Sequence, residues 1–122
     1  MVSGVYIGQA AVAQQISFDI TPPGVTVDVS STPGKISAQT GKDSADFYLT
    51  SDEDFQAYQI RKVPADDSTV TEGTLIESGG GGTASSPIPL NVTAAELAAA
   101  SLGEGQHRIK VFVQDIAGNW SV

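Results

Sequence analysis

Arg108-Ile-Lys-Val-Phe-Val-Gln-Asp-Ile-Ala-Gly-Asn-Trp-Ser-Val122 is the stretch of sequence that decides the fold. From position 109 to position 114 aliphatic residues occupy every second place, which is typical of a strand with one buried face. Asp-Ile-Ala-Gly-Asn then forms a turn, because Asp and Asn bond nearby backbone and Gly118 can adopt a positive φ. Trp120 offers an apolar anchor for a returning strand. The stretch therefore predicts a β-hairpin that closes a sheet.

The same alternation recurs along the chain, in short segments separated by turns rich in Gly, Pro, Ser and Asp. One segment differs: Thr93-Ala-Ala-Glu96 is a capping box, which predicts a helix over residues 94–101 that crosses from one sheet to the other. The predicted fold is all-β, an Ig-like Greek-key β-sandwich of about seven strands with one short helix and an N-terminal arm. Strands are expected over residues 25–29, 45–50, 55–63, 73–77, 88–92 and 108–114.

The composition limits the size and the partners of the molecule. With 122 residues, 13 Gly and 6 Pro, the chain is long enough for one domain with a thin core and frequent turns. Its net charge of −8 argues against nucleic acid and anionic membranes as partners, because phosphate recognition needs a basic surface. No apolar run approaches the ~20 residues of a membrane span, so membrane insertion is not expected.

Few side chains are suited to catalysis or metal binding. The chain has no Cys and a single histidine, His107, so neither a thiolate site nor a Ser-His-Asp triad can be built. We therefore expect a non-enzymatic protein without a cofactor. The segment Gly79–Ser86 is rich in glycine but carries no phosphate-binding pattern, which indicates a flexible loop tip. Asp43, Asp52 and Asp54 are weak candidates for Ca²⁺, because carboxylates in turns are ordinary turn chemistry.

Residues 1–21 are predicted to form an N-terminal arm, and residues 22–122 a sandwich domain, with Pro22-Pro23-Gly24 at the boundary. The start of the chain lacks the basic region of a signal peptide. The arm either pairs with a neighbouring chain or supplies extra strands to the same domain, and the residues leave both possibilities open. Its candidate contact residues for assembly are Val5, Tyr6, Ile7, Ile16, Phe18 and Ile20.

The predicted last hairpin ends two residues after Trp120, which is short for a final strand. Either the natural chain continues, or the arm completes the sheet in this molecule or in a neighbour, and we favour the arm. Phe112 and Trp120 are further candidates for interaction. Tyr48 and Phe112 fall on the outward faces of their strands, where aromatic rings can stack on sugars. The alternative, which we favour, is that Trp120 packs in the core while Tyr48 and Phe112 cover sheet surface.

Several stretches together resemble Ig-like modules of bacteriophage virion proteins, in tails, tail fibres and related structural proteins, and also Ig-like modules of bacterial surface proteins. The similarity covers roughly residues 22–122, and its most specific mark is the Asp-x-Ala-Gly-Asn-Trp hairpin. The stretches that carry it are Lys35-Ile-Ser-Ala38, Gly41-Lys-Asp43, Phe47-Tyr-Leu-Thr-Ser-Asp-Glu-Asp-Phe55, Gly73-Thr-Leu-Ile-Glu-Ser78 and Arg108–Trp120.

The resemblance implies a non-enzymatic structural protein or module of a phage virion, in which the arm serves assembly and the Ig-like domain is displayed. Its partners would be other virion proteins or copies of itself, and its location the virion. The alternative is a carbohydrate-binding or adhesive module that contacts glycans of the host cell surface, or a module of the bacterial cell surface.

Overall fold

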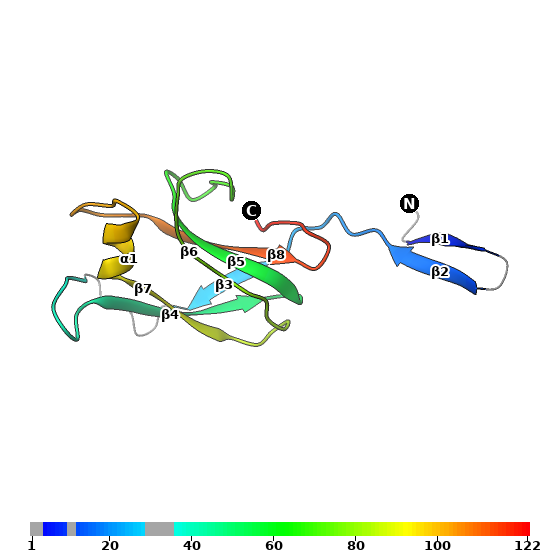
Figure 1. Ribbon diagram of the computed structural model, residues 1–122, viewed down its shortest axis with the longest axis horizontal. Helices are drawn as coiled ribbons and strands as arrows, with labels where there is room; N and C mark the ends of the chain where they lie inside the picture. Colours follow the sequence, from blue (N-terminus) through cyan, green and yellow to red (C-terminus); the bar gives the residue numbers. More distant parts are fainter. Residues whose placement is uncertain (1–3, 10–11, 29–35) are drawn as a thin grey trace.

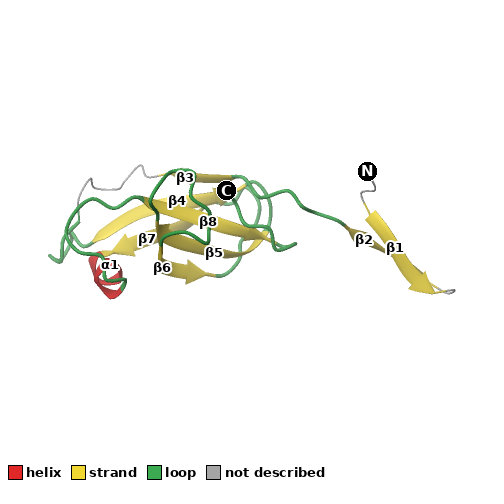
Figure 2. Ribbon diagram, turned by 90° about the horizontal axis from the view of Figure 1, so that it is seen from above, coloured by secondary structure: helices red, strands yellow, loops and turns green. Residues whose placement is uncertain are grey.

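The computed structural model describes residues 4–9, 12–28 and 36–122. Six strands form two antiparallel three-stranded sheets that face each other as a β-sandwich, and one short helix lies at one end (Figure 1). At the other end a separate two-stranded hairpin projects from this body, as the view in Figure 2 also shows. The predicted all-β sandwich with one helix is therefore confirmed. Within the described residues, no helix is long and apolar enough to cross a membrane.

Each sheet takes its strands from distant parts of the sequence. The order in the first sheet is β3-β4-β7, and the order in the second is β6-β5-β8. The helix α1 (Ala94–Ala99) links β7 of the first sheet to β8 of the second, as predicted. The strands of the body are β3 (Val25–Asp28), β4 (Ser44–Ser51), β5 (Phe55–Lys62), β6 (Thr74–Gly79), β7 (Ile88–Thr93) and β8 (Ile109–Asp115).

The core lies between the two sheets and is built from the alternating residues of the strands. Leu49 of the first sheet is fully buried, as are Ile60 and Val113 of the second. Burial of one such side chain contributes about 1.5–3 kcal/mol relative to exposure, so the facing rows hold the sheets together. The remaining members of this buried cluster are Phe47, Phe55, Val92 and Val111.

The prediction of Phe112 as a surface residue is wrong. Its side chain has no exposed area, although it points away from the main core, as the alternation along β8 requires. Val63, which precedes the loop over residues 64–72, is buried as well, and so is Ser68 within that loop. The loop over residues 64–72 therefore covers this part of the outer sheet surface.

Two cationic side chains hold that loop in place: Lys110 in β8 and Arg108 directly before it. Lys110 Nζ donates to the carbonyl oxygens of Asp66 and Ser68, both at 2.8 Å, and lies 5.1 Å from the centre of the Phe112 ring. Arg108 forms an ion pair with Asp66, with 2.9 Å between Nε and Oδ1. Charged donors on buried or half-buried carbonyls are the stronger class of hydrogen bond, which explains why a polar loop packs against an aromatic ring.

The helix is shorter than predicted, and the predicted returning strand at Trp120 is reduced to a single bridge. The capping box at Thr93 and Glu96 is present, but α1 ends at Ala99, because Ser101 adopts a left-handed φ of 61° that no helix continues through. Trp120 is half-buried and makes only an isolated bridge to Gln114, in place of a full returning strand.

The hairpin of β1 (Gly4–Gln9) and β2 (Val12–Ser17) pairs only with itself among the described residues. Within the described residues of one molecule, the arm adds no strand to either sheet of the body. Pairing with a neighbouring chain stays a prediction. Residues 1–3, 10–11 and 29–35, including the predicted strand end Val29 and the start of the segment at Lys35, lie outside the described residues.

Candidate functional site

The segment that joins the hairpin to the body is fixed to the sandwich by side chains of two loops. Asn119 Nδ2 donates to the carbonyl oxygen of Asp19 at 3.0 Å. Further along, the Gly24 amide donates to Asp52 Oδ1 at 2.8 Å, and the Asp52 amide donates back to the Gly24 carbonyl at 3.0 Å. A Cβ at Gly24 would lie 2.7 Å from Asp52 Oδ2, so a larger residue here would displace the Asp52 carboxylate. The arm thus leaves the body from a defined point.

The turn after β8 is organised around a buried carboxylate. Asp115 has no exposed area, and its two oxygens accept from the Asn119 amide at 2.8 Å and from Asn119 Nδ2 at 3.0 Å. Gly118 completes the turn with a φ of 97°. Burial alone would raise the pKa of Asp115, but the hydrogen bonds from Asn119 and from the turn backbone together lower it. The Asp-x-Ala-Gly-Asn pattern is therefore a structural turn that also orients Asn119 towards the arm.

Three carboxylates from distant parts of the sequence meet at this end of the sandwich. One oxygen from each of Asp19, Glu53 and Asp115 lies within 4.8 Å of the others. Burial raises the pKa of Glu53, and the negative charges of Asp115, Asp19 and Asp52 raise it further. Such a group of oxygens could hold a hard cation such as Ca²⁺, or it could relieve its repulsion by protonation of Glu53.

The carboxylates proposed from the sequence as Ca²⁺ candidates do not form that group. Asp43 precedes β4 and Asp52 follows it, so an eight-residue strand separates them. Asp52 Oδ1 accepts from Gly24, and Asp54 Oδ1 accepts from the Ala84 amide at 2.8 Å. Both carboxylates therefore anchor neighbouring loops. Sequence reasoning missed the observed trio, although the Asp-x-Ala-Gly-Asn turn was a signal for one of its members.

The predicted interaction residues of the arm divide into two groups. Phe18 and Ile20 are 62% and 61% exposed, and Ile116 in the nearby turn after β8 is 66% exposed. Large apolar residues therefore surround the point where the arm meets the body. In the hairpin, the register pairs Val5 with Ile16, while Tyr6 and Ile7 lie opposite Gln15 and Gln14.

The outer face of the first sheet carries the other exposed aromatic residue named from the sequence. Tyr48 is 46% exposed, and it lines a shallow hollow of about 260 Å³ together with Asp28, Thr50 and Pro87. Because Phe112 is buried, Tyr48 is the one of these two residues whose ring can stack on a ligand.

No family model, curated protein or solved structure matched the chain in our comparisons.

Proposed function

We propose that the chain is a non-enzymatic structural module of a phage virion, in which the N-terminal hairpin serves assembly and the sandwich is displayed. The observation that carries this proposal is the arrangement of arm and body: the hairpin forms a sheet of its own and projects beyond the sandwich (Figure 1). Its partners in that role are copies of itself or other virion proteins.

The hairpin has the properties of an assembly element. A two-stranded ribbon alone in water is at best marginally stable, so it gains order by packing on a further strand or surface. Its two outer edges carry unpaired backbone groups that can add a strand from a partner. The exposed side chains of Phe18 and Ile20 place apolar surface on the segment between the ribbon and the body. The fixed linker transmits the position of the assembled arm to the sandwich.

The strand order of the body supports the resemblance to Ig-like modules. In the naming of Ig-like domains, β3-β4-β7 corresponds to strands A, B and E, and β6-β5-β8 corresponds to C′, C and F. The turn at Asp115 would then be the F–G turn, with Trp120 at the start of strand G. Modules of this kind serve as spacers and decorations on extended assemblies, which suits a body held away from its attachment point.

Sedimentation of the full chain, alone and with phage particles that carry it, tests the proposal. We expect the chain to self-associate or to co-sediment, and the double substitution V5K/I7K to abolish either behaviour, because lysines on the ribbon oppose packing. L75K is the matched control, since Leu75 is 43% exposed on β6 of the body. A wild-type chain that stays monomeric and does not sediment with the particles would overturn the proposal.

A second candidate function, binding of host-surface glycans, is favoured by Tyr48 alone. An exposed tyrosine beside the carboxylate of Asp28 and the hydroxyl of Thr50 offers a stacking face and hydrogen-bonding groups for a sugar. Glycan-array binding that Y48A removes and L75A preserves would support this function. An array without any bound glycan would exclude it for the sugars displayed.

A further inference from the structure

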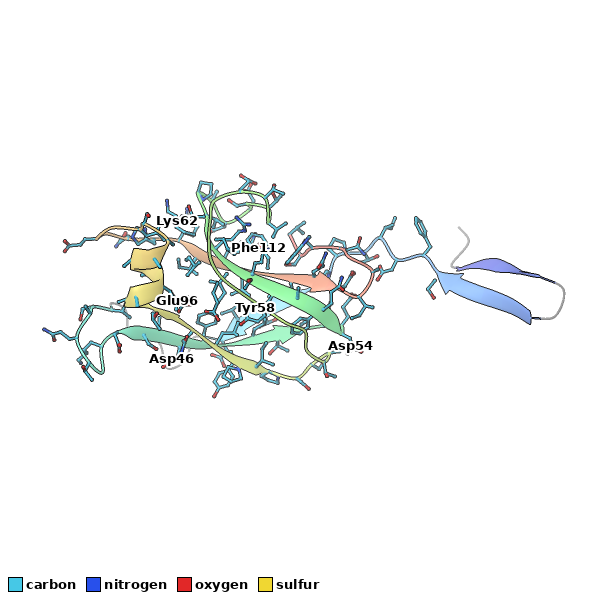
Figure 3. The ribbon with its side chains drawn as sticks, in the orientation of Figure 1. Asp46, Asp54, Tyr58, Lys62, Glu96 and Phe112 are labelled. Atoms are coloured by element: carbon cyan, nitrogen blue, oxygen red, sulfur yellow. The ribbon has the colours of Figure 1, made fainter. Side chains whose placement is uncertain are left out.

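A cleft lies between the two sheets on the side of β6 and β7. Its volume is about 560 Å³, and its lining includes Phe47 and Leu90 from the first sheet and Tyr58 and Glu77 from the second. Figure 3 shows Tyr58 between the sheets and Glu96 on α1 at one end of the molecule. Helix α1 contacts both β6 and β7, so it closes this end.

Glu77 has an unusual position for a carboxyl group. Its Oε1 accepts a hydrogen bond from the Tyr58 hydroxyl at 3.3 Å. Its Oε2 is buried and has no donor among the described residues. The other hydrogen-bond neighbour of this carboxyl is the carboxyl group of Glu96. Neither glutamate has a cationic partner in the described part of the chain, where the ion pair found joins Arg108 to Asp66.

Glu96 is already committed to the helix cap. Its Oε1 accepts from the Thr93 amide at 3.0 Å and from the Thr93 hydroxyl at 3.1 Å. Both bonds use the same carboxyl oxygen of Glu96 as their acceptor. Two ionised carboxylates can only accept, so the contact between Glu77 and Glu96 is a hydrogen bond only when one of them carries a proton. Glu77 is the group we assign it to, because its buried Oε2 has no other hydrogen-bond partner among the described residues.

We propose that Glu77 and Glu96 share one proton, and that this proton ties α1 to β6 across the end of the cleft. Loss of the proton places two negative charges side by side and loosens the helix from the sheet. Among the described residues, Tyr58 of β5 bonds to Glu77, and Asp46 of β4 lines the same cleft. Neither can neutralise a second negative charge.

The titration of Glu77 agrees in direction with this geometry. Burial raises its pKa above 4.5, and the hydrogen bond to Glu96 and the charge of Glu96 raise it further, against a lowering by the Tyr58 hydroxyl. A raised pKa in the folded state means that folding favours the protonated form. The stabilisation is therefore complete at acidic pH and is lost as the pH rises through the pKa of Glu77 in the folded protein.

Two measurements on the full chain test the proposal. Carbon-detected NMR of the side-chain carboxyl groups should show Glu77 titrating at higher pH than Glu104, an exposed glutamate in the same spectrum. Thermal unfolding of E77Q, whose amide can donate to Glu96 at any pH, should match wild type near pH 4 and exceed its Tm by a few degrees near pH 7. E104Q is the control and should follow wild type throughout.

Amide exchange locates the effect in the helix. The Ala100 and Leu102 amides, which bond to the carbonyl oxygens of Glu96 and Leu97, should lose protection in wild type as the pH passes the Glu77 titration, and should keep it in E77Q. Glu77 titrating together with Glu104, or a Tm of E77Q at or below wild type near pH 7, would overturn the shared proton. Equal protection of these amides in both proteins would overturn the tie to the helix.

Discussion

Asn119 joins the buried turn of the body to the start of the arm. Its amide and side chain donate to the two oxygens of Asp115, and its Nδ2 also donates to the carbonyl of Asp19. Asn119 thus donates two hydrogen bonds to a buried carboxylate and also fixes the linker. Because Asp115 has no contact with solvent, removal of a donor leaves part of its charge uncompensated.

We expect N119A to lower the free energy of unfolding by about 1–3 kcal/mol, the cost of a buried acceptor that loses its partner. Urea denaturation followed by circular dichroism measures this loss. N91A is the control, because Asn91 is exposed on β7 and surface changes usually stay within about 0.5 kcal/mol. Equal stability of the two variants would show that the turn does not depend on Asn119.

The pH dependence of stability should contain a component from Asp115. Hydrogen bonds from Asn119 and the turn backbone outweigh burial and lower its pKa below 3.8. A lowered pKa means that the stabilisation is present above the ordinary pKa and is lost as the pH falls through the folded-state value. The difference in unfolding free energy between wild type and D115N should therefore shrink as the solution is acidified. A difference that stays constant between neutral and acidic pH contradicts this assignment.

At the scale of elements, the loop over residues 64–72 acts as a cover for the outer surface of the second sheet. It contributes no regular strand, yet its carbonyl oxygens bond to Lys110, whose Nζ lies 5.1 Å from the centre of the fully buried Phe112 ring. Lys110 and Arg108 fix it by donating hydrogen bonds to carbonyl oxygens that lie 42 to 44 residues earlier in the sequence. Arg108 donates to Pro64, and Lys110 donates to Asp66 and Ser68.

We expect K110M to release this loop without unfolding the sandwich. The substitution removes two charge-assisted hydrogen bonds to the Asp66 and Ser68 carbonyls, each worth about 1.5–3 kcal/mol. Amides of residues 64–72 should exchange faster, while those of β5 keep their protection. K62M, which changes a half-buried lysine on β5, serves as the control. Unchanged exchange in the loop of K110M would show that the loop does not depend on Lys110.

The strands could be predicted from the sequence because their alternation is a local property. The expected strand over residues 55–63 is observed as Phe55–Lys62, and the capping box marks the helix start at its true position. The cover over Phe112 could not be predicted, because an outward position on a strand says nothing about a distant loop that folds back on it. The same holds for the trio of Asp19, Glu53 and Asp115, whose members meet only in the folded chain.

At the scale of the whole molecule, a compact sandwich and a projecting hairpin have separate roles in our account. The body encloses a buried core, whereas each strand of the hairpin pairs along one edge among the described residues. The linker between them is held by Asn119 and Asp52, so the orientation of the body follows that of the assembled arm. This arrangement fits a module that is anchored at one end and exposed at the other.

A cryo-electron microscopy map of the phage assembly that contains this chain tests the account most directly. We expect density for the sandwich outside the particle wall, connected at the end near Asp115 to a hairpin that lies among strands or surfaces of its neighbours. A map in which the sandwich is buried in the wall while the hairpin extends free into solvent would contradict the account.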